Sequence, residues 1–269
     1  MAIAGGTVVL TSLKNPWVKT LRKLHQAKYR RQQQQFLLEG THLIQEAIAT
    51  QYPLLAVCAT SEWQVRHAAL WQQLGHCTER QETVSSEVLG AIATTQTPDG
   101  VVATASSEIV TTAIHRPSLG LALEDIQDPG NVGTLMRTAV AAGSDSFWLS
   151  QNSVDLTNPK VLRASAGQWF RLPKQVGVDL AAQLLAWREQ GCQILATASA
   201  GAMPYTKLDL TRPTVLVMGN EGAGLSANAI GAADQTVAIP MMNGVESLNV
   251  GVAAAVILFE ALRQRQQQF

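Results

Sequence analysis

The stretch that decides the fold lies near the C-terminus and reads Val237-Ala238-Ile239-Pro240-Met241-Met242-Asn243-Gly244-Val245-Glu246-Ser247-Leu248-Asn249. Its first three residues are apolar, as at the end of a buried strand, and Pro240 has no N–H with which to continue a strand ladder. Asn243-Gly244 is a turn dipeptide, and a helix is expected to start near Ser247. A loop between a strand end and a helix start faces the ligand in many α/β proteins. This stretch therefore predicts an α/β fold with a ligand site near its C-terminus.

The polar residues of this loop have two interpretations. Glu246, Ser247 and Asn249 place a carboxylate, a hydroxyl and an amide within four positions. Serine and asparagine are also common helix caps, so the loop alone does not establish a site. Apolar residues spaced three and four apart predict the buried face of the following helix. They are Leu248, Val252, Ala255, Val256, Phe259 and Leu262.

Composition indicates a globular protein with a substantial core. Of 269 residues, 46% are hydrophobic and 15% are charged, and the length allows two domains. No apolar run is long enough for a membrane span and the start does not resemble a signal peptide, so we expect a cytoplasmic protein with no membrane association. The three cysteines are widely spaced with no C-x-x-C, and the five histidines form no ligand pair. We therefore expect neither a disulfide framework nor a metal site.

A net charge of zero hides an asymmetry at the N-terminus. Residues 1–38 contain no acidic residue. Their seven basic residues are Lys14, Lys19, Arg22, Lys23, Lys28, Arg30 and Arg31. Such a segment favours contact with a polyanion such as RNA over an ordinary solvated helix face, which mixes signs. Trp17 and Tyr29 lie among these charges and either stack on unpaired bases or belong to the core.

The order of predicted elements indicates two domains. Residues 1–108 alternate short strands with helices, including one long helix expected from Asn15 to about Gln35, and predict a small α/β domain that binds RNA. A serine- and threonine-rich break ending in Arg116-Pro117 marks a linker at 109–118. Residues 119–269 alternate more regularly, which predicts a mostly parallel sheet with helices on both faces.

The first group of polar residues follows the strand expected at Leu119 to Leu123. The sequence from Asp128 reads Asp-Pro-Gly, a turn, and Asn131 is the expected helix cap. The apolar face of that helix leaves Arg137 on its other side. Side chains on a helix lean toward its N-terminus, so Arg137 lies over Gly133 and is expected to reach the loop end of the strand.

The second group is a buried strand that runs into Gly219-Asn220-Glu221-Gly222-Ala223-Gly224. The pattern is neither G-x-G-x-x-G nor a phosphate loop ending in Gly-Lys-Ser/Thr. Glu221 repels a phosphate and suits a ligand with positive charge or N–H donors. We expect this loop, the Asn131–Arg137 region and the loop 239–249 to meet at a catalytic site.

Three ordered motifs carry a resemblance to a known family. They are Asn131-x-Gly133-x-x-x-Arg137, Gly219-Asn220-Glu221-Gly222-x-Gly224-Leu225, and Ile239-Pro240-Met241 with Glu246-Ser247-Leu248-Asn249-Val250. Together they resemble the motifs of the SpoU (TrmH-type) ribose 2′-O-methyltransferases of the SPOUT class. The segment from Arg163 to Pro173 is similar to the stretch between the family's first two motifs. Residues 1–100 resemble the substrate-binding domain that precedes many of these enzymes, which is similar to small RNA-binding ribosomal proteins.

The resemblance implies transfer of the methyl group of S-adenosylmethionine to a ribose 2′-hydroxyl in RNA, by a homodimer with a deep trefoil knot in its C-terminal sheet. The implied cofactor-binding residues are Ala198, Gly219, Ile239, Leu248 and Asn249. The implied catalytic residues are Arg137, Asn131, Glu221, Ser247 and Asn249. A guanidinium stays protonated, so Arg137 is expected to stabilise the developing alkoxide rather than act as a free base.

Other functions remain open at this stage. Ribosomal RNA is favoured because the N-terminal domain resembles that of ribosomal RNA methylases, and transfer RNA is the alternative substrate. A non-catalytic RNA-binding factor for ribosome assembly is a further alternative, although a binder has no need of all five catalytic candidates. A nucleotide-dependent oxidoreductase is disfavoured because no G-x-G-x-x-G follows the first strand of either half.

Overall fold

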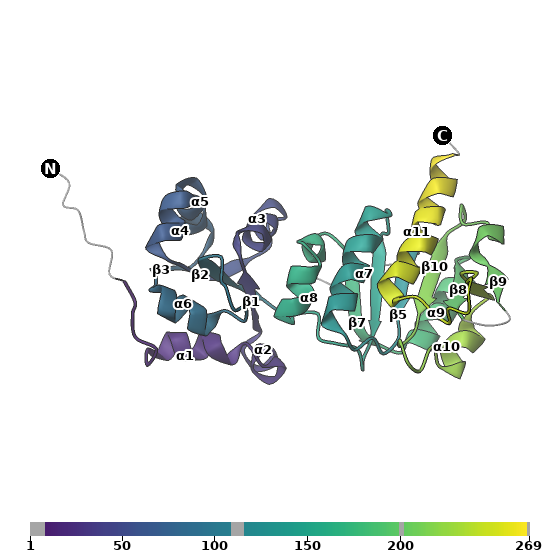
Figure 1. Cartoon of the computed structure of the whole chain (residues 1–269), viewed down its shortest axis with the longest axis horizontal. Helices are drawn as coiled ribbons and strands as arrows, with labels where there is room; N and C mark the ends of the chain where they lie inside the picture. The colour runs from purple at the N-terminus through teal and green to yellow at the C-terminus, as the bar shows by residue number, and fades with distance from the viewer. Residues whose placement is uncertain (1–8, 109–115, 199–201, 268–269) are drawn as a thin grey trace. The chain divides into compact units, whose positions relative to one another are not determined.

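The computed structural model describes residues 9–108, 116–198 and 202–267 (Figure 1). Contacts divide the chain into two compact units. One unit holds residues 1–109 together with Thr157–Phe170, and the other holds Val110–Leu156 and Arg171–Phe269. Most of the predicted linker, residues 109–115, lies outside the described residues. No helix among the described residues is long and apolar enough to cross a membrane.

The first unit contains, within its described residues, a four-stranded sheet in the order β1-β4-β2-β3. The strands are β1 (Gln35–Glu39), β2 (Leu54–Ala59), β3 (Arg80–Thr83) and β4 (Val101–Ser106). β4 runs antiparallel to β1 and β2, whereas β2 and β3 are parallel. The helices are α1 (Pro16–Lys23), α2 (Ala27–Gln33), α3 (Thr41–Ala49), α4 (Ser61–Arg66), α5 (Ala68–Cys77) and α6 (Ser86–Ile92).

The single helix expected from Asn15 to Gln35 is two helices, so that prediction is wrong. Asn15 caps α1 by accepting a hydrogen bond from the N–H of Trp17. The helix ends after Lys23, and the Arg30 guanidinium donates to the free carbonyls of Leu24 and His25 at 3.0 and 2.9 Å. The break is therefore stabilised by a side chain from the second helix, which helical periodicity does not reveal.

The segment Thr157–Phe170 belongs to the first unit by its contacts, although it follows strand β6 (Ser146–Ser150) of the second unit in sequence. It contains α8 (Pro159–Ala164) and a short 3-10 turn at Gln168–Phe170. The Trp169 ring lies 5.3 Å from the Phe36 ring and 5.4 Å from that of Tyr52. Arg163 pairs with the buried carboxylate of Glu39 at 3.2 Å. The contact division thus differs from the predicted assignment of this segment to residues 119–269.

The second unit contains, in its described part, a seven-stranded sheet in the order β7-β6-β5-β10-β8-β11-β9. The strands are β5 (Leu119–Leu123), β6 (Ser146–Ser150), β7 (Lys174–Val178), β8 (Gln193–Thr197), β9 (Met203–Pro204), β10 (Thr214–Met218) and β11 (Gln235–Ala238). The helices are α7 (Pro129–Ala141), α9 (Leu180–Glu189), α10 (Ala227–Ala232) and α11 (Val250–Gln266), with a 3-10 turn at Tyr205–Lys207. The strand pairings are parallel, which confirms the predicted sheet type.

Two pairs of helices cover this sheet. Val215 and Val217 of β10 belong to a buried cluster with α9 and α10. Alternate strand residues face opposite sides, so Leu216 faces away from that cluster. α7 and α11 lie side by side (Figure 1). From β5 the chain first adds β6 and β7 toward one edge of the sheet and then adds β8 to β11 toward the other edge. Where the direction of strand addition reverses, parallel sheets have a crevice at the carboxyl ends of their strands.

α11 differs from its prediction in start and in buried face. It starts at Val250 with Asn249 as its cap, so the expected start near Ser247 is too early. Its buried residues are Val250, Gly251, Ala254, Ile257, Leu258 and Ala261. Val252 and Phe259 of the predicted face are 50% and 47% exposed. The helix has apolar residues on more than one side, and periodicity alone selected the wrong one.

Candidate functional site

A cavity of about 460 Å³ lies at the carboxyl ends of β8, β10 and β11, three adjacent strands. Thr197 and Ala198 line it after β8, and the loop after β10 contributes Gly219 to Leu225. The loop after β11 adds Ile239, Met241, Glu246, Ser247 and Leu248. Val250, Ala253 and Ile257 of α11 complete one wall. Its size falls in the usual range for small-molecule sites, about 300–1,000 Å³.

The glycine-rich loop after β10 closes on itself. The N–H of Asn220 donates to the carbonyl of Gly224 at 3.1 Å, and the N–H of Gly224 donates back at 2.9 Å. A Cβ on Gly219 would stand 2.4 Å from the backbone of Gly224, so this approach requires glycine. The Asn220 Oδ1 accepts from the N–H groups of Gly222 and Ala223. These donors are thus occupied within the loop, in contrast to the free donors of a phosphate loop.

Asn220 also ties this loop to the neighbouring strand end. Its Nδ2 donates to the carbonyl of Asp125 at 2.9 Å. Asp125 has φ +54°, a left-handed conformation that aspartate adopts more readily than most residues, and its carboxylate accepts from the Ser150 hydroxyl at 2.8 Å. No pattern in the sequence indicates this role for Asn220. Its side chain is one of the links between the loops that follow β5 and β10.

Three of the predicted catalytic residues form one hydrogen-bonded set. Asn131 Nδ2 donates to Glu221 Oε1 at 2.6 Å. Asn249 Nδ2 donates to Asn131 Oδ1 at 3.0 Å, while Asn249 Oδ1 caps α11 by accepting from the N–H of Gly251. The three predicted loops therefore meet, with the Asn131 amide as the connection between the other two.

The expected cap at Asn131 is wrong, and the correction explains why its side chain is available. α7 is capped by Asp128, whose carboxylate accepts from the N–H of Asn131 at 2.8 Å, and Pro129 occupies the first turn. Proline suits this position because a first-turn N–H has no partner within the helix. Asn131 thus lies in the first turn with its amide directed to Glu221 and Asn249.

Arg137 lies on α7 two turns beyond the cap and is exposed. Across the described parts of the chain it has no hydrogen-bond or ion-pair partner, and it does not line the cavity. It is therefore unpaired on the surface of the helix that carries Asn131. The alternative interpretation of Arg137, a surface arginine paired with Asp125 or Asp128, is not what the structure shows: the Asp128 carboxylate caps α7 and the Asp125 carboxylate accepts from Ser150.

Four of the five predicted cofactor-binding residues line the cavity, and the fifth, Asn249, lies at the start of α11. Ala198, Gly219, Ile239 and Leu248 line the cavity, as do the catalytic candidates Glu221 and Ser247. Asn249 is not part of the lining and instead holds the start of α11 next to Asn131. Apolar lining residues that sequence analysis did not select include Leu225, Ile230 and Ile257. They belong to helices or loop ends whose patterns do not differ from those of core residues.

The cavity wall has a distinctive charge. Two carboxylates, Glu221 and Glu246, belong to it, and among the residues described there no lysine, arginine or histidine does. A wall with acidic side chains and apolar surface suits a ligand with an apolar part and a positive charge. No group of three or more acidic, histidine or cysteine side chains in the described ranges is placed to hold a metal.

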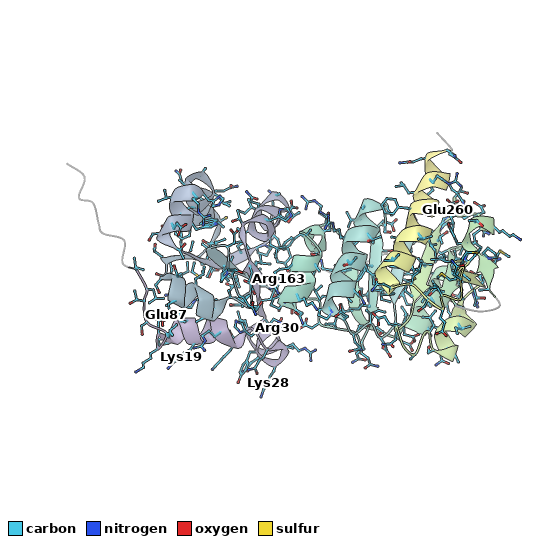
Figure 2. The ribbon with its side chains drawn as sticks, viewed as in Figure 1. Lys19, Lys28, Arg30, Glu87, Arg163 and Glu260 are labelled. Carbon is cyan, nitrogen blue, oxygen red and sulfur yellow. The ribbon has the colours of Figure 1, made fainter. Side chains whose placement is uncertain are left out.

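The basic N-terminal residues are mostly on the surface of the first unit. Lys14, Lys19, Arg22, Lys23, Lys28 and Arg31 are exposed. Figure 2 shows Lys19 and Lys28 at the edge of this unit. Arg30 is the exception: it is 3% exposed and also donates to Thr157 Oγ1 at 3.1 Å, so the prediction that it contacts RNA is wrong.

The two aromatic residues in this segment differ in their surroundings. The Arg80 guanidinium lies over the Trp17 ring at 4.1 Å, and Trp17 packs against the buried cluster of α1 and α6. Tyr29 has the ammonium groups of Lys23 and Lys28 at 5.5 and 6.0 Å from its ring. Trp17 is therefore a structural residue, whereas Tyr29 remains a candidate for stacking on a base.

Comparison with known proteins gives consistent matches over both units. The SpoU rRNA Methylase family model matches residues 118–259, and the MRM3-like substrate binding domain model matches residues 15–103. An uncharacterized tRNA/rRNA methyltransferase of Synechocystis sp. is 44% identical over 257 residues, which cover 95% of this chain and 94% of that protein. The 23S rRNA (guanosine(2553)-2′-O)-methyltransferase RlmP of Bacillus subtilis is 32% identical, covering 93% and 97%.

A solved structure is similar over nearly the whole chain. The crystal structure of an AdoMet-bound rRNA methyltransferase from Sinorhizobium meliloti superposes with a TM-score of 0.85 at 30% identity. The match covers 96% of this chain and 98% of that one.

Proposed function

Because this chain belongs to the SpoU rRNA methylase family, we propose that it transfers the methyl group of S-adenosylmethionine to the ribose 2′-hydroxyl of a nucleotide in ribosomal RNA. The observation that carries the proposal is the meeting of three loops at one cavity, where Asn131 joins Glu221 and Asn249. Ribosomal RNA is the substrate in the name of the Bacillus subtilis relative, which matches both units.

The cavity fits S-adenosylmethionine by its size and by the chemistry of its wall. Ala198, Gly219, Ile239 and Leu248 offer backbone groups and apolar surface for the adenosine and methionine parts. Glu221 and Glu246 offer negative charge near a cationic ligand. When bound, this cofactor supplies an electrophilic methyl group on a sulfonium. The residues of the chain must then align the hydroxyl and stabilise the alkoxide that develops as its proton leaves to solvent.

Arg137 is the proposed catalytic residue. A ribose hydroxyl is a weak nucleophile until its proton is withdrawn, and a guanidinium stabilises the alkoxide that develops. Its lack of a protein partner within the described residues leaves its donors for the ribose oxygen and an adjacent phosphate. Asn131, Glu221, Ser247 and Asn249 have positioning roles in this proposal. The hydrogen bonds among Asn131, Glu221 and Asn249 order the loops on which the ribose would lie.

The test compares variants of Arg137 in methyl transfer and in cofactor binding. Arg137→Ala is expected to reduce methyl transfer to RNA by about 100-fold or more, the effect of removing a donor that stabilises developing charge. The affinity for S-adenosylmethionine, measured by calorimetry, is expected to stay within about twofold because Arg137 does not line the cavity. Arg137→Lys keeps the charge but lacks the forked donors, so it is expected to retain partial activity.

Lys207→Ala is the matched control, since it removes an exposed cation from the same unit outside the cavity. This variant is expected to keep wild-type transfer. Wild-type turnover by Arg137→Ala would remove Arg137 from the mechanism. Equal loss in the Lys207 variant would show that overall charge, not the position of Arg137, matters.

The N-terminal unit is proposed to bind the RNA through phosphates. Lys14, Lys19, Arg22, Lys23, Lys28 and Arg31 are the candidate contacts. Such contacts give affinity that falls with salt and carry no base specificity. Tyr29, flanked by two lysines, is the candidate for stacking on an unpaired nucleotide.

The second unit is proposed to contain the trefoil knot and to pair with a second copy of the chain. Val252 and Phe259 form an exposed apolar stripe on α11. Their spacing of seven residues places them on one side of the helix. Exposed apolar stripes of this kind mark interfaces, and α7 with Arg137 lies next to α11. A homodimer through this stripe therefore brings the catalytic candidate close to the interface.

A further inference from the structure

Glu246 is the cavity carboxylate to which the proposed reaction assigns no positioning or catalytic role. The other one, Glu221, accepts a hydrogen bond from Asn131 at 2.6 Å and is held in the set of three loops. Glu246 is exposed to the cavity and has no hydrogen-bond or ion-pair partner in the parts of the chain that the structure describes. Its charge is therefore not neutralised by the protein.

The turn before Glu246 explains why it faces the cavity. Asn243 and Gly244 both have positive φ, +57° and +74°, and the N–H of Val245 donates to the carbonyl of Met242 at 3.2 Å. The turn reverses the chain after β11. Glu246, Ser247 and Leu248 consequently return to the cavity wall before α11 starts at Val250.

The charge of this wall matters because the ligand changes charge in the reaction. When the ribose oxygen forms its bond to the methyl carbon, the electron pair of the broken C–S bond stays on sulfur, and the hydroxyl proton leaves to solvent. The sulfonium becomes a neutral thioether. The cosubstrate and the product S-adenosylhomocysteine thus have nearly the same shape but differ by one positive charge.

We propose that Glu246 is a specificity-determining residue that makes the cavity prefer the cationic methyl donor over its neutral product. This inference rests on the proposed use of S-adenosylmethionine. A single carboxylate in the cavity wall attracts the sulfonium and has little net interaction with the thioether. The preference lowers inhibition by the product and helps it leave after each turnover. Glu221 keeps its charge as well, but its carboxylate is held by Asn131 in the set of three loops, so its removal would also disturb those loops.

The test is calorimetric titration of the full chain with three probes: S-adenosylmethionine, S-adenosylhomocysteine and sinefungin, which has an amine in place of the sulfonium. Glu246→Gln keeps the size of the side chain and removes its charge. It is expected to weaken binding of the two cationic probes by about two- to fivefold, the effect of one solvent-exposed charge pair. Binding of S-adenosylhomocysteine is expected to stay unchanged.

Glu189→Gln is the matched control, because Glu189 is an exposed carboxylate of the same unit, at the end of α9 and outside the cavity. It is expected to leave all three affinities unchanged. In the wild type, raising the salt concentration is expected to reduce the preference for the cationic probes, and in Glu246→Gln this effect is expected to be weaker.

Equal loss for all three probes would show that Glu246 shapes the loop or pairs with the α-ammonium that all three share, and either result would overturn the inference. An unchanged preference in Glu246→Gln would also overturn it. Failure of the wild type to bind any of the three probes would contradict the proposed function itself. A wild type that binds the probes but transfers no methyl group to RNA would contradict the proposed reaction. It would not contradict the proposed binding preference.

Discussion

Glu221 and Asn249 follow Asn131 by 90 and 118 positions in the sequence, yet the three side chains form one hydrogen-bonded set. The sequence predicts this meeting because each residue follows a strand end in a parallel sheet, where carboxyl ends share an edge. It does not predict the order of the connections. Asp128 and Asn131 are equally good capping residues, so the sequence does not show which of them caps α7. Asp128 is the cap in the structure, and this leaves the Asn131 side chain free to reach the other loops.

Gly219 offers a sharp test of the cavity. An alanine Cβ there would stand 2.4 Å from the Gly224 backbone, so Gly219→Ala must displace the loop that forms the wall. We expect affinity for S-adenosylmethionine to fall by about tenfold or more, because overpacking costs about 1–3 kcal/mol. Calorimetry measures the affinity.

Gly231→Ala in α10 is the control for this substitution. A Cβ at Gly231 meets nothing within 4 Å, so the variant is expected to bind normally and to be stabilised by up to about 1 kcal/mol. Wild-type affinity in Gly219→Ala would show that the loop does not form the binding wall.

Arg30 and Arg31 are adjacent in sequence and opposite in environment. Composition placed both on an RNA-binding surface, because a count of charges does not distinguish a buried guanidinium from an exposed one. Arg30 donates to two carbonyls at the end of α1, and Arg31 is exposed. Only the contacts of the folded chain separate their roles.

This pair gives a matched prediction for RNA binding. Arg30→Met is expected to lower the free energy of unfolding by about 1–3 kcal/mol, because it leaves buried carbonyls without donors. Arg31→Met is expected to leave stability unchanged. It is expected to reduce the slope of log affinity for ribosomal RNA against log salt concentration by about 1, the value for one lost phosphate contact. Denaturant unfolding and filter binding at several salt concentrations measure these effects. The reverse pattern would place Arg30, and not Arg31, on the RNA.

At the scale of helices and strands, sequence patterns predicted the central elements better than the edges. β5 and β10 are apolar runs that lie next to each other in the sheet and were expected as strands. β3 and β7 were not expected, because Arg80–Thr83 and Lys174–Val178 are rich in polar residues. Edge strands have only one neighbour, so their sequences are less constrained to be apolar.

The predicted apolar face of α11 lies exposed in the single chain, which gives a prediction about assembly. Val252 is 50% exposed in the stripe with Phe259, and a charge there would be buried in a dimer. Val252→Asp is expected to shift the protein from dimer to monomer in sedimentation velocity at micromolar concentration.

Val65→Asp is the control, because Val65 is 81% exposed on α4 and lies outside the stripe. That variant is expected to sediment as the wild type does. A dimer that persists in Val252→Asp would place the interface elsewhere.

The edge strand β7 contains a buried lysine whose stability effect depends on pH. Burial lowers the pKa of Lys174 from the ordinary 10.5 to about 7. Below pH 7 both the folded and unfolded states are protonated, and the folded state bears the full cost of burying the charge. Between pH 7 and about 10.5 the unfolded state binds more protons, so stability rises with pH.

Lys174→Met removes this cost. The variant is expected to be more stable than the wild type by about 2–4 kcal/mol at pH 6, with a gain that shrinks as the pH rises toward 10. Denaturant unfolding at pH 6, 8 and 9.5 measures the difference. A gain that is constant across these values would show that Lys174 titrates at its ordinary pKa.

At the scale of the whole molecule, the alternation of elements predicted two units and a parallel sheet in the second. It did not predict that Thr157–Phe170 contacts the first unit. The anchors of that segment are Trp169 against Phe36 and Arg163 on Glu39. Such contacts join residues more than 100 positions apart, and local composition carries no signal of them.

The central claim is that the cavity and the three loops perform one reaction, methyl transfer to a ribose oxygen of ribosomal RNA. Its most direct test incubates the full chain with ribosomal RNA and S-adenosylmethionine whose methyl group is isotopically labelled, followed by digestion to nucleosides and mass spectrometry. The account predicts label on the 2′-oxygen of one nucleoside, lost in Arg137→Ala. Label on a base, or no label from a protein that binds S-adenosylmethionine, would contradict it.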